Sequence, residues 1–229
     1  DVVCLQELKT TEDKFPFEEI KAAGYQAAVY GQKTYNGVAI LSKSEPGDIR
    51  SGFGADDEDP QARLIAATIN SVRVVSAYFP NGNTVGSDKW EYKLAWMQKL
   101  LSLVEKSYTA DQPLLICGDT NIAIADHDVA KPDRWADSVL CAPPGREALQ
   151  KLLDWGLVDV FGQKHAEGGV YSWWDYRQRA FPKGVGLRFD HILATKPLAT
   201  QCTAVAIDRD ERKGKQPSDH APVIAEFST

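Results

Sequence analysis

Short apolar runs rich in β-branched residues recur along the chain, and they constrain its fold more than any other feature. Each run has the length of a strand and is bounded by Gly, Pro, Asn or Asp, residues that commonly end strands. We therefore predict strands over residues 2–5, 37–41, 64–69, 72–79, 114–117, 189–194, 204–207 and 223–227.

Apolar residues at helical spacing separate some of these runs. Residues 145–155 carry a leucine stripe that stops at Gly156, and a weaker pattern over 17–23 stops at Gly24. The strongest pattern spans 88–108, and one face of that predicted helix carries Trp90, Leu94, Met97, Leu101 and Val104.

Many strands joined by short turns, with few helices, favour an α/β (α+β) fold. We expect a four-layer sandwich of two packed, mostly antiparallel β-sheets flanked by helices. No repeat, linker or composition shift marks a boundary, so residues 1–229 are expected to form one domain. The acidic run Asp56-Asp57-Glu58-Asp59 is expected to be a solvated loop. Asp1 leads directly into a strand, so we expect the sequence to be N-terminally incomplete.

Composition narrows the possible environments. The net charge of −6 argues against a nonspecific polyanion binder, but local charge at a site can still suit a nucleic-acid enzyme. The four cysteines show no zinc-binding spacing and favour a reducing, cytoplasmic setting. No apolar run approaches the roughly 20 residues that cross a bilayer, so no membrane partner is expected.

Polar residues at the ends of predicted strands are the candidates for chemistry. Glu7, Asp119, Asp190 and Asp219 with His220 all adjoin apolar runs, where a rigid sheet can hold side chains in fixed geometry. Each has an ordinary structural reading: Glu7 as a surface charge, and Asp119 or Asp219 as a turn former. Several such ends in one chain favour a site.

The residue types indicate phosphodiester hydrolysis. Carboxylates without clustered cysteine or histidine favour a hard cation such as Mg²⁺. Hydrolysis also needs a base, a group facing the developing charge and a stabilised leaving oxygen. Asp119, His220 and Tyr78 are suited to these roles beside a metal at Glu7, with Asn121 as an orienting group.

The chain resembles the exonuclease III class of apurinic/apyrimidinic endonucleases, within the endonuclease/exonuclease/phosphatase superfamily. The matching segments span nearly the whole chain in the family's order. They are Leu5-Gln6-Glu7, Tyr35-Asn36-Gly37-Val38-Ala39-Ile40-Leu41, Tyr78-Phe79-Pro80-Asn81-Gly82, Gly118-Asp119-Thr120-Asn121, Tyr171-Ser172-Trp173-Trp174-Asp175-Tyr176-Arg177, Gly186-Leu187-Arg188-Phe189-Asp190 and Ser218-Asp219-His220-Ala221-Pro222.

This resemblance implies an enzyme that uses Mg²⁺, or Mn²⁺ as a substitute, to cut duplex DNA 5′ to abasic sites. It also implies 3′–5′ exonuclease and 3′-phosphodiesterase or phosphatase activity on 3′-blocked ends, in a monomer of the bacterial cytoplasm associated with the nucleoid. Glu7 and Asp219 would bind metal, and Asp119 would activate water or protonate the leaving oxygen. The remaining catalytic positions are Asn121 and Tyr78 at the phosphate and Asp190, which orients His220.

The resemblance further implies DNA contacts. Trp173 and Leu187 would line an apolar pocket for the base-less sugar, whereas Trp174 is either pocket or packing. A second basic rim would come from Arg209, Arg212, Lys213 and Lys215. The other expected contacts lie in or beside the matching loops: Lys9, Lys33, Tyr35, Lys93, Arg177 and Arg188.

Two alternatives stay open at this point. A phosphatase of the same superfamily that acts on phosphoinositides or lipid phosphodiesters would share Asp119 and His220. A catalytically weakened DNA-binding relative is the other alternative. This alternative is supported by the absence of the family's first strand and helix. The missing strand ends in an asparagine that contributes to the family's metal site. We therefore expect weak or no activity from this chain.

Overall fold

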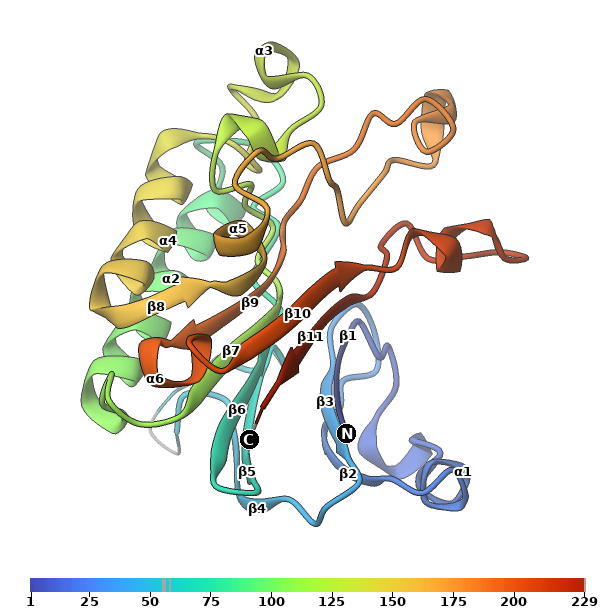
Figure 1. Cartoon of the computed structure of the whole chain (residues 1–229), viewed down its shortest axis with the longest axis vertical. Helices are drawn as coiled ribbons and strands as arrows, with labels where there is room; N and C mark the ends of the chain where they lie inside the picture. The colour runs from blue at the N-terminus through green and yellow to red at the C-terminus, as the bar shows by residue number, and fades with distance from the viewer. Residues whose placement is uncertain (55–56, 58, 229) are drawn as a thin grey trace.

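A six-stranded sheet is the largest of three strand ladders in the computed structural model, which describes residues 1–54, 57 and 59–228 (Figure 1). Strands β6 and β7 run parallel in this sheet, and its other neighbouring strands run antiparallel. Its order is β4 (Gly47–Ser51), β5 (Leu64–Ile69), β6 (Val72–Ala77), β7 (Leu114–Asp119), β9 (Asp190–Thr195) and β8 (Leu157–Asp159).

Two smaller antiparallel ladders pack on one face of this sheet. One has the order β1 (Val2–Gln6), β3 (Val38–Ser42), β2 (Gln26–Tyr30), and the other pairs β10 (Cys202–Ile207) with β11 (Val223–Phe227). The first buries Val38 and Ile40 against Ile65 and Ala67 of β5. The predicted second β layer is therefore present, as two separate ladders.

Helices cover the opposite face of the six-stranded sheet (Figure 1). Because side chains alternate along a strand, Leu64 and Ala66 of β5 face away from the smaller ladders. They pack in one cluster with α2 (Asp88–Ser107) and α4 (Pro143–Gly156). On the far side of the molecule, α1 (Phe17–Ala22) covers β2 and β3 through Ile20. The expected four layers are confirmed.

Short elements complete the chain around these layers. They are α3 (Pro132–Trp135), α5 (Val160–Lys164) and α6 (Lys196–Ala199), with 3-10 turns η1 (Glu12–Lys14), η2 (Asp126–Asp128), η3 (Arg177–Arg179) and η4 (Arg209–Lys213). No helix of the described residues is long and apolar enough to cross a membrane. The four cysteines are free thiols. Of the acidic run, Asp56 and Glu58 lie outside the described residues.

Every predicted strand and helix is present, with ends that differ by at most two residues. The sequence patterns missed β2, β4 and β8. Strand β4 is exposed throughout and lacks apolar alternation, β8 follows α4 without a turn, and β2 is rich in alanine. These strands exist because neighbouring strands pair with them, which no local pattern records.

Gly118 allows β7 to approach β6 at the point where β7 reaches Asp119. Its φ is +138°, and a Cβ there would lie 2.1 Å from the carbonyl oxygen of Ala77 and 3.1 Å from Cδ of Gln6. Only a residue without a side chain fits this approach.

Gly118→Ala is expected to lower the free energy of unfolding by about 2 kcal/mol more than the control Gly54→Ala. Both glycines have φ values that L-residues rarely adopt, +138° and +124°, but a Cβ at Gly54 has nothing within 4 Å. Urea unfolding followed by circular dichroism measures both losses. Equal losses would contradict the steric argument.

Arg188 was expected to bind DNA phosphates, and the structure corrects this. Its guanidinium is buried, with Nε 2.7 Å from Oδ1 of Asp128 and a terminal nitrogen 2.7 Å from Oδ2 of Asp159. The same nitrogen lies 3.0 Å from Nδ1 of His191. Arg188 therefore ties η2 and β8 to the start of β9, and its donors face inward.

Arg188→Met is expected to destabilise the protein by about 3–5 kcal/mol, because it leaves two carboxylates near each other without a buried cation. The control is Arg177→Met, whose side chain is 88% exposed and which should change stability by less than about 0.5 kcal/mol. Thermal and urea unfolding of both variants provide the test. A small loss for Arg188→Met would show that the cluster relaxes or binds water.

Candidate active site

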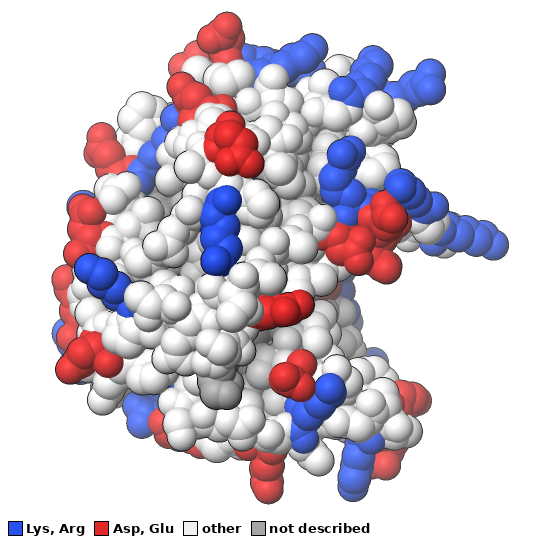
Figure 2. Space-filling model, viewed as in Figure 1, with Lys and Arg blue, Asp and Glu red and all other residues white. Residues whose placement is uncertain are grey.

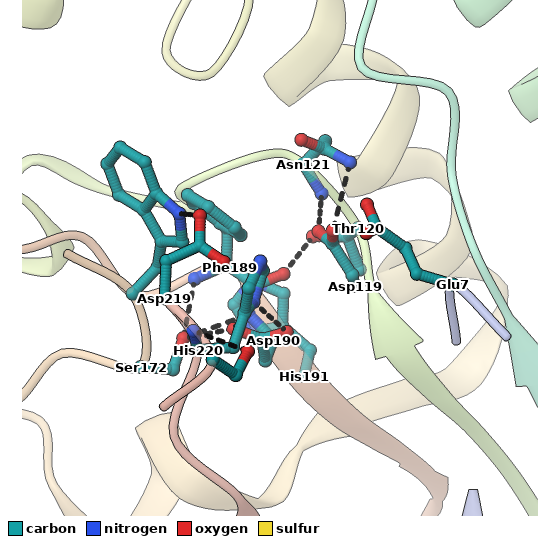
Figure 3. A network of polar contacts seen from close by, with 12 residues as sticks. Glu7, Asp119, Thr120, Asn121, Ser172, Phe189, Asp190, His191, Asp219 and His220 are labelled. Atoms are coloured by element: carbon teal, nitrogen blue, oxygen red, sulfur yellow. Dashed lines mark hydrogen bonds and ion pairs between the residues drawn. The ribbon is translucent and has the colours of Figure 1, made fainter. Parts of the chain in front are cut away.

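The polar strand ends meet at one edge of the β layers (Figure 3). Asp119 ends β7 and pairs in register with Asp190, the first residue of β9. His220 comes from the segment before β11 and forms an isolated bridge with Trp173. Glu7 directly follows β1 and reaches toward this group from the other side.

His220 and Asp190 form an imidazole–carboxylate pair. Nδ1 of His220 lies 3.0 Å from both carboxylate oxygens, and Ser172 Oγ donates to Asp190 Oδ2 at 2.6 Å. Burial lowers the pKa of His220. The charge of Asp190 and its hydrogen bond to the ring raise that pKa by more than burial lowers it, so the net value is about 10. The ring is therefore an oriented imidazolium at neutral pH.

Asp119 is buried beside this pair. Burial raises the pKa of Asp119 to about 7, the charge of His220 opposes the rise, and the charge of Asp190 adds to it. The backbone N–H of Asn121 donates to Oδ1 at 2.8 Å, and its side-chain amide donates to Oδ2 at 3.1 Å. A carboxylate oxygen of Asp119, one of Asp190 and an imidazole nitrogen of His220, all atoms that can bind a metal ion, lie within 4.8 Å of one another.

Hydrogen bonds engage both the oxygen and the nitrogen of the Asn121 side-chain amide. Its Nδ2 also donates to the carbonyl oxygen of Phe79 at 3.1 Å, and its Oδ1 accepts from Nδ2 of Asn81 at 2.8 Å. Its backbone has a left-handed φ of 52°. The Asn81–Asn121–Asp119 chain fixes where the amide points.

Glu7, which follows β1 of the three-stranded ladder, contacts Tyr78, which follows β6 of the six-stranded sheet. The Tyr78 hydroxyl donates a hydrogen bond to Glu7 Oε1, and Lys9 Nζ lies 2.8 Å from Glu7 Oε2. Burial raises the pKa of Glu7, but hydrogen bonds from Lys9 and Tyr78 outweigh that effect and lower it. Burial and the charge of Asp119 raise the pKa of Tyr78 well above its usual value, so the phenol keeps its proton.

Asp219 and Glu7 are suited to a divalent cation. Trp173 Nε1 donates to Asp219 Oδ2 at 2.9 Å, which fixes that carboxylate. Lys9 Nζ already lies 2.8 Å from Glu7 Oε2, and the charges of Glu7 and Asp219 both raise the pKa of its ammonium, so both carboxylates attract a cation. Oxygen donors of this kind match the preference of Mg²⁺. The residues present therefore fit the predicted metal.

The structure separates the predicted DNA contacts into two groups. Lys9, Lys33, Tyr35 and Arg177 are exposed. Lys93 and Leu187 are fully buried, which corrects their assignment as contacts. Lys93 Nζ donates to backbone carbonyls, and Leu187 packs in a cluster that Trp173 covers. Trp173 itself is partly buried, so one of the two predicted pocket residues remains at the surface.

Basic side chains gather on two arms beside the site (Figure 2). The arms contain η3 and η4, and their exposed cations are Arg177, Arg179, Lys183, Arg209, Lys213 and Lys215. Arg212, predicted to lie on this rim, is instead buried and stacks over Tyr176 and Phe181. Trp174 is packing, because it is fully buried against Phe181. The arms border a hollow on this face of the molecule (Figure 2).

Sequence reasoning gave no role to three residues that shape the site. Asn81 and Ser172 stand in the quoted motifs, and each holds a catalytic candidate, Asn121 and Asp190 respectively. Arg63 lies over the Tyr78 ring at 4.9 Å and donates to the Tyr78 carbonyl oxygen at 3.2 Å. Position within a motif was the available signal for Asn81 and Ser172, and Arg63 had none.

Comparisons with known proteins agree with this geometry. The model of the Endonuclease/Exonuclease/phosphatase family matches residues 1–220. Exodeoxyribonuclease III of Haemophilus influenzae is 39% identical over 239 residues, which cover 99% of this chain and 90% of that protein.

Two solved structures superimpose on the whole chain. An AP endonuclease from Archaeoglobus fulgidus gives a TM-score of 0.95 at 38% identity, covering 100% of this chain and 89% of that one. A 3′ phosphatase from Neisseria bound to a product DNA hairpin gives 0.95 at 42% identity, with coverage of 100% and 89%. The prediction from the motifs is confirmed: this chain belongs to the endonuclease/exonuclease/phosphatase family, in its exodeoxyribonuclease III group.

Proposed function

We propose that the protein is a Mg²⁺-dependent DNA-repair phosphodiesterase that cuts the backbone 5′ to abasic sites. We include 3′–5′ exonuclease and 3′-phosphatase activity in the proposal. The observation that carries it is geometric: His220, oriented by Asp190, lies beside the buried carboxylate of Asp119. The hydrogen-bonded pair of Tyr78 and Glu7 completes this group. The relatives named above are DNA nucleases or act at DNA 3′ ends, which supports this choice of substrate.

Each group then has a distinct task. Asp119, held by two hydrogen bonds from Asn121, accepts a proton from the attacking water. The imidazolium of His220 and the phenol of Tyr78 face the charge that develops on the phosphoryl oxygens. Mg²⁺, held by Glu7 and Asp219, supplies charge neutralisation at the phosphate when bound.

An apolar surface beside the imidazole supports a preference for abasic sites. Trp173 bridges to His220 through the backbone, packs against Phe189 with the rings tilted and their centroids 5.4 Å apart, and forms an edge contact with Trp135. A nucleotide without a base has little stacking to lose when it rotates out of the duplex. A small apolar surface next to the reacting phosphate suits such a sugar and not an intact nucleotide.

The partners and setting follow from the same proposal. The exposed cations Lys9, Lys33 and Arg177 are assigned to DNA phosphates, and Tyr35 to a contact beside them. We assign the protein to the cytoplasm as a monomer on duplex DNA, as the family resemblance of its motifs implies.

The full-length protein should cut a duplex oligonucleotide with one tetrahydrofuran site in Mg²⁺, or Mn²⁺, and leave it intact in EDTA. Asp119→Asn is expected to slow cutting by about 100-fold or more, because it removes the base. Asp111→Asn is the matched control, an exposed aspartate before β7. Denaturing gels of single-turnover reactions measure the rates.

A soluble phosphoinositide and a lipid phosphodiester are assayed beside the oligonucleotide. Faster hydrolysis of either would replace the nuclease by the phosphatase alternative. An Asp119→Asn variant that cuts as fast as the parent would overturn the assigned mechanism.

Affinity for the same duplex should fall steeply as salt rises, because cations on the arms displace counterions from phosphates. Arg177→Gln is expected to reduce the slope of log Kd against log salt by about 1. Lys151→Gln, an exposed change on α4 in the helical layer, should leave the slope unchanged. Fluorescence anisotropy from low to high salt gives both slopes, and a flat response in the parent would contradict the phosphate contacts.

A further inference from the structure

Lys93 is a fully buried lysine in the second turn of α2, on the buried face of the helix that also carries Trp90 and Met97. Its Nζ donates to the carbonyl oxygens of Asn81 at 3.2 Å, Asn121 at 2.8 Å and Val139 at 2.8 Å. These three acceptors belong to three separate connections: the one after β6, the one after β7 and the one before α4.

The surroundings are built for an ammonium group. Three carbonyl acceptors match its three N–H donors, so no donor is left unpaired. Burial lowers the pKa of Lys93 to about 7, and the charge of Asp119 opposes that shift. Only the protonated amine can donate to all three carbonyls, so the geometry is that of the ammonium form. The side chain passes Gly82, where a Cβ would lie 3.1 Å from Lys93 Cδ, and Nζ lies 5.6 Å from the Trp90 ring centroid.

Two of the three acceptors belong to residues that position Asp119. Asn81 donates its side-chain amide to Asn121, and Asn121 donates to Asp119. Lys93 therefore holds the backbone on both sides of the Asn81–Asn121 hydrogen bond. Asn121 also has a left-handed backbone, which needs support from its neighbours.

We propose that Lys93 is a positioning residue, which holds the carbonyls of Asn81, Asn121 and Val139 and so keeps Asn121 aligned with Asp119 and the scissile phosphate. It does not touch DNA, because no part of its side chain reaches the surface. The proposal rests on the proposed function for the role of Asn121. The alternative is that Lys93 only stabilises the fold.

The test uses Lys93→Met, which keeps the length of the side chain and removes its donors. The single-turnover rate on the tetrahydrofuran duplex is expected to fall about 10- to 100-fold, since a small displacement of a catalytic group has that effect. The Kd for the duplex should stay within about 3-fold, because Lys93 makes no DNA contact. Lys106→Met, an exposed change in the last turn of α2, is the matched control.

A double-mutant cycle separates positioning from stability. In an Asn121→Ala background, Lys93→Met should slow the reaction by less than about 3-fold, because the group it positions is gone. A purely structural role predicts the same fold-loss in both backgrounds, and that result would overturn the proposal. Lys93→Gln, which keeps two donors, replaces Lys93→Met in the cycle if the latter unfolds at the assay temperature.

A measurement that does not depend on catalysis distinguishes failure of the Lys93 proposal from failure of the proposed function. The side-chain amide signal of Asn121 in ¹H–¹⁵N spectra, assigned from its loss in Asn121→Ala, should shift or broaden in Lys93→Met or Lys93→Gln and stay in place in Lys106→Met. An unmoved signal overturns the role of Lys93 even if the parent cuts DNA. A parent that cuts neither abasic nor 3′-phosphate DNA, with a moved signal, overturns the proposed function alone.

Discussion

The pairing of β7 with β9 places two carboxylates, Asp119 and Asp190, opposite each other at one end of the six-stranded sheet. The charge of the partly buried Asp190 raises the pKa of the buried Asp119, and a nearby cation opposes that effect. His220 is that cation. Its hydrogen bond with Asp190 orients the ring, and its charge lowers the pKa of Asp119, which burial raises. The rest of the site depends on this arrangement, because the register of two strands fixes it.

Other buried cations hold the loops around this centre. Arg188 joins Asp128 and Asp159, and Lys93 joins three backbone carbonyls. Arg212 donates to the carbonyl oxygens of Ser218 and Trp174, beside the segment that carries Asp219 and His220. Loops lack the ladder hydrogen bonds of strands, so charge-assisted bonds to carbonyls and carboxylates supply the rigidity that a catalytic geometry needs.

Positive and negative side chains are unevenly distributed over the surface, which the net charge of −6 does not reveal. Exposed cations extend from the two arms around η3 and η4, of which the η4 arm also carries the exposed Asp210 and Glu211, and further acidic side chains are spread over the helical side (Figure 2). A binding face depends on charges within about a Debye length, roughly 10 Å at 0.1 M salt, and not on the sum over the molecule. An acidic protein can therefore present a basic surface to a phosphate backbone.

Local patterns in the sequence determined most of the secondary structure and the catalytic candidates. β-Branched runs, helical spacing and polar residues at strand ends are local signals, so the strands, the main helices and residues such as Asp119 and His220 could be predicted. Exposure was another matter. Lys93, Arg188 and Leu187 were expected to contact DNA, yet all three are buried. Strands β2 and β4 likewise depend on pairing with β3 and β5, which their own residues do not signal. Only the tertiary structure decides which side of a loop a cation faces, because that depends on the acceptors that packing brings to it.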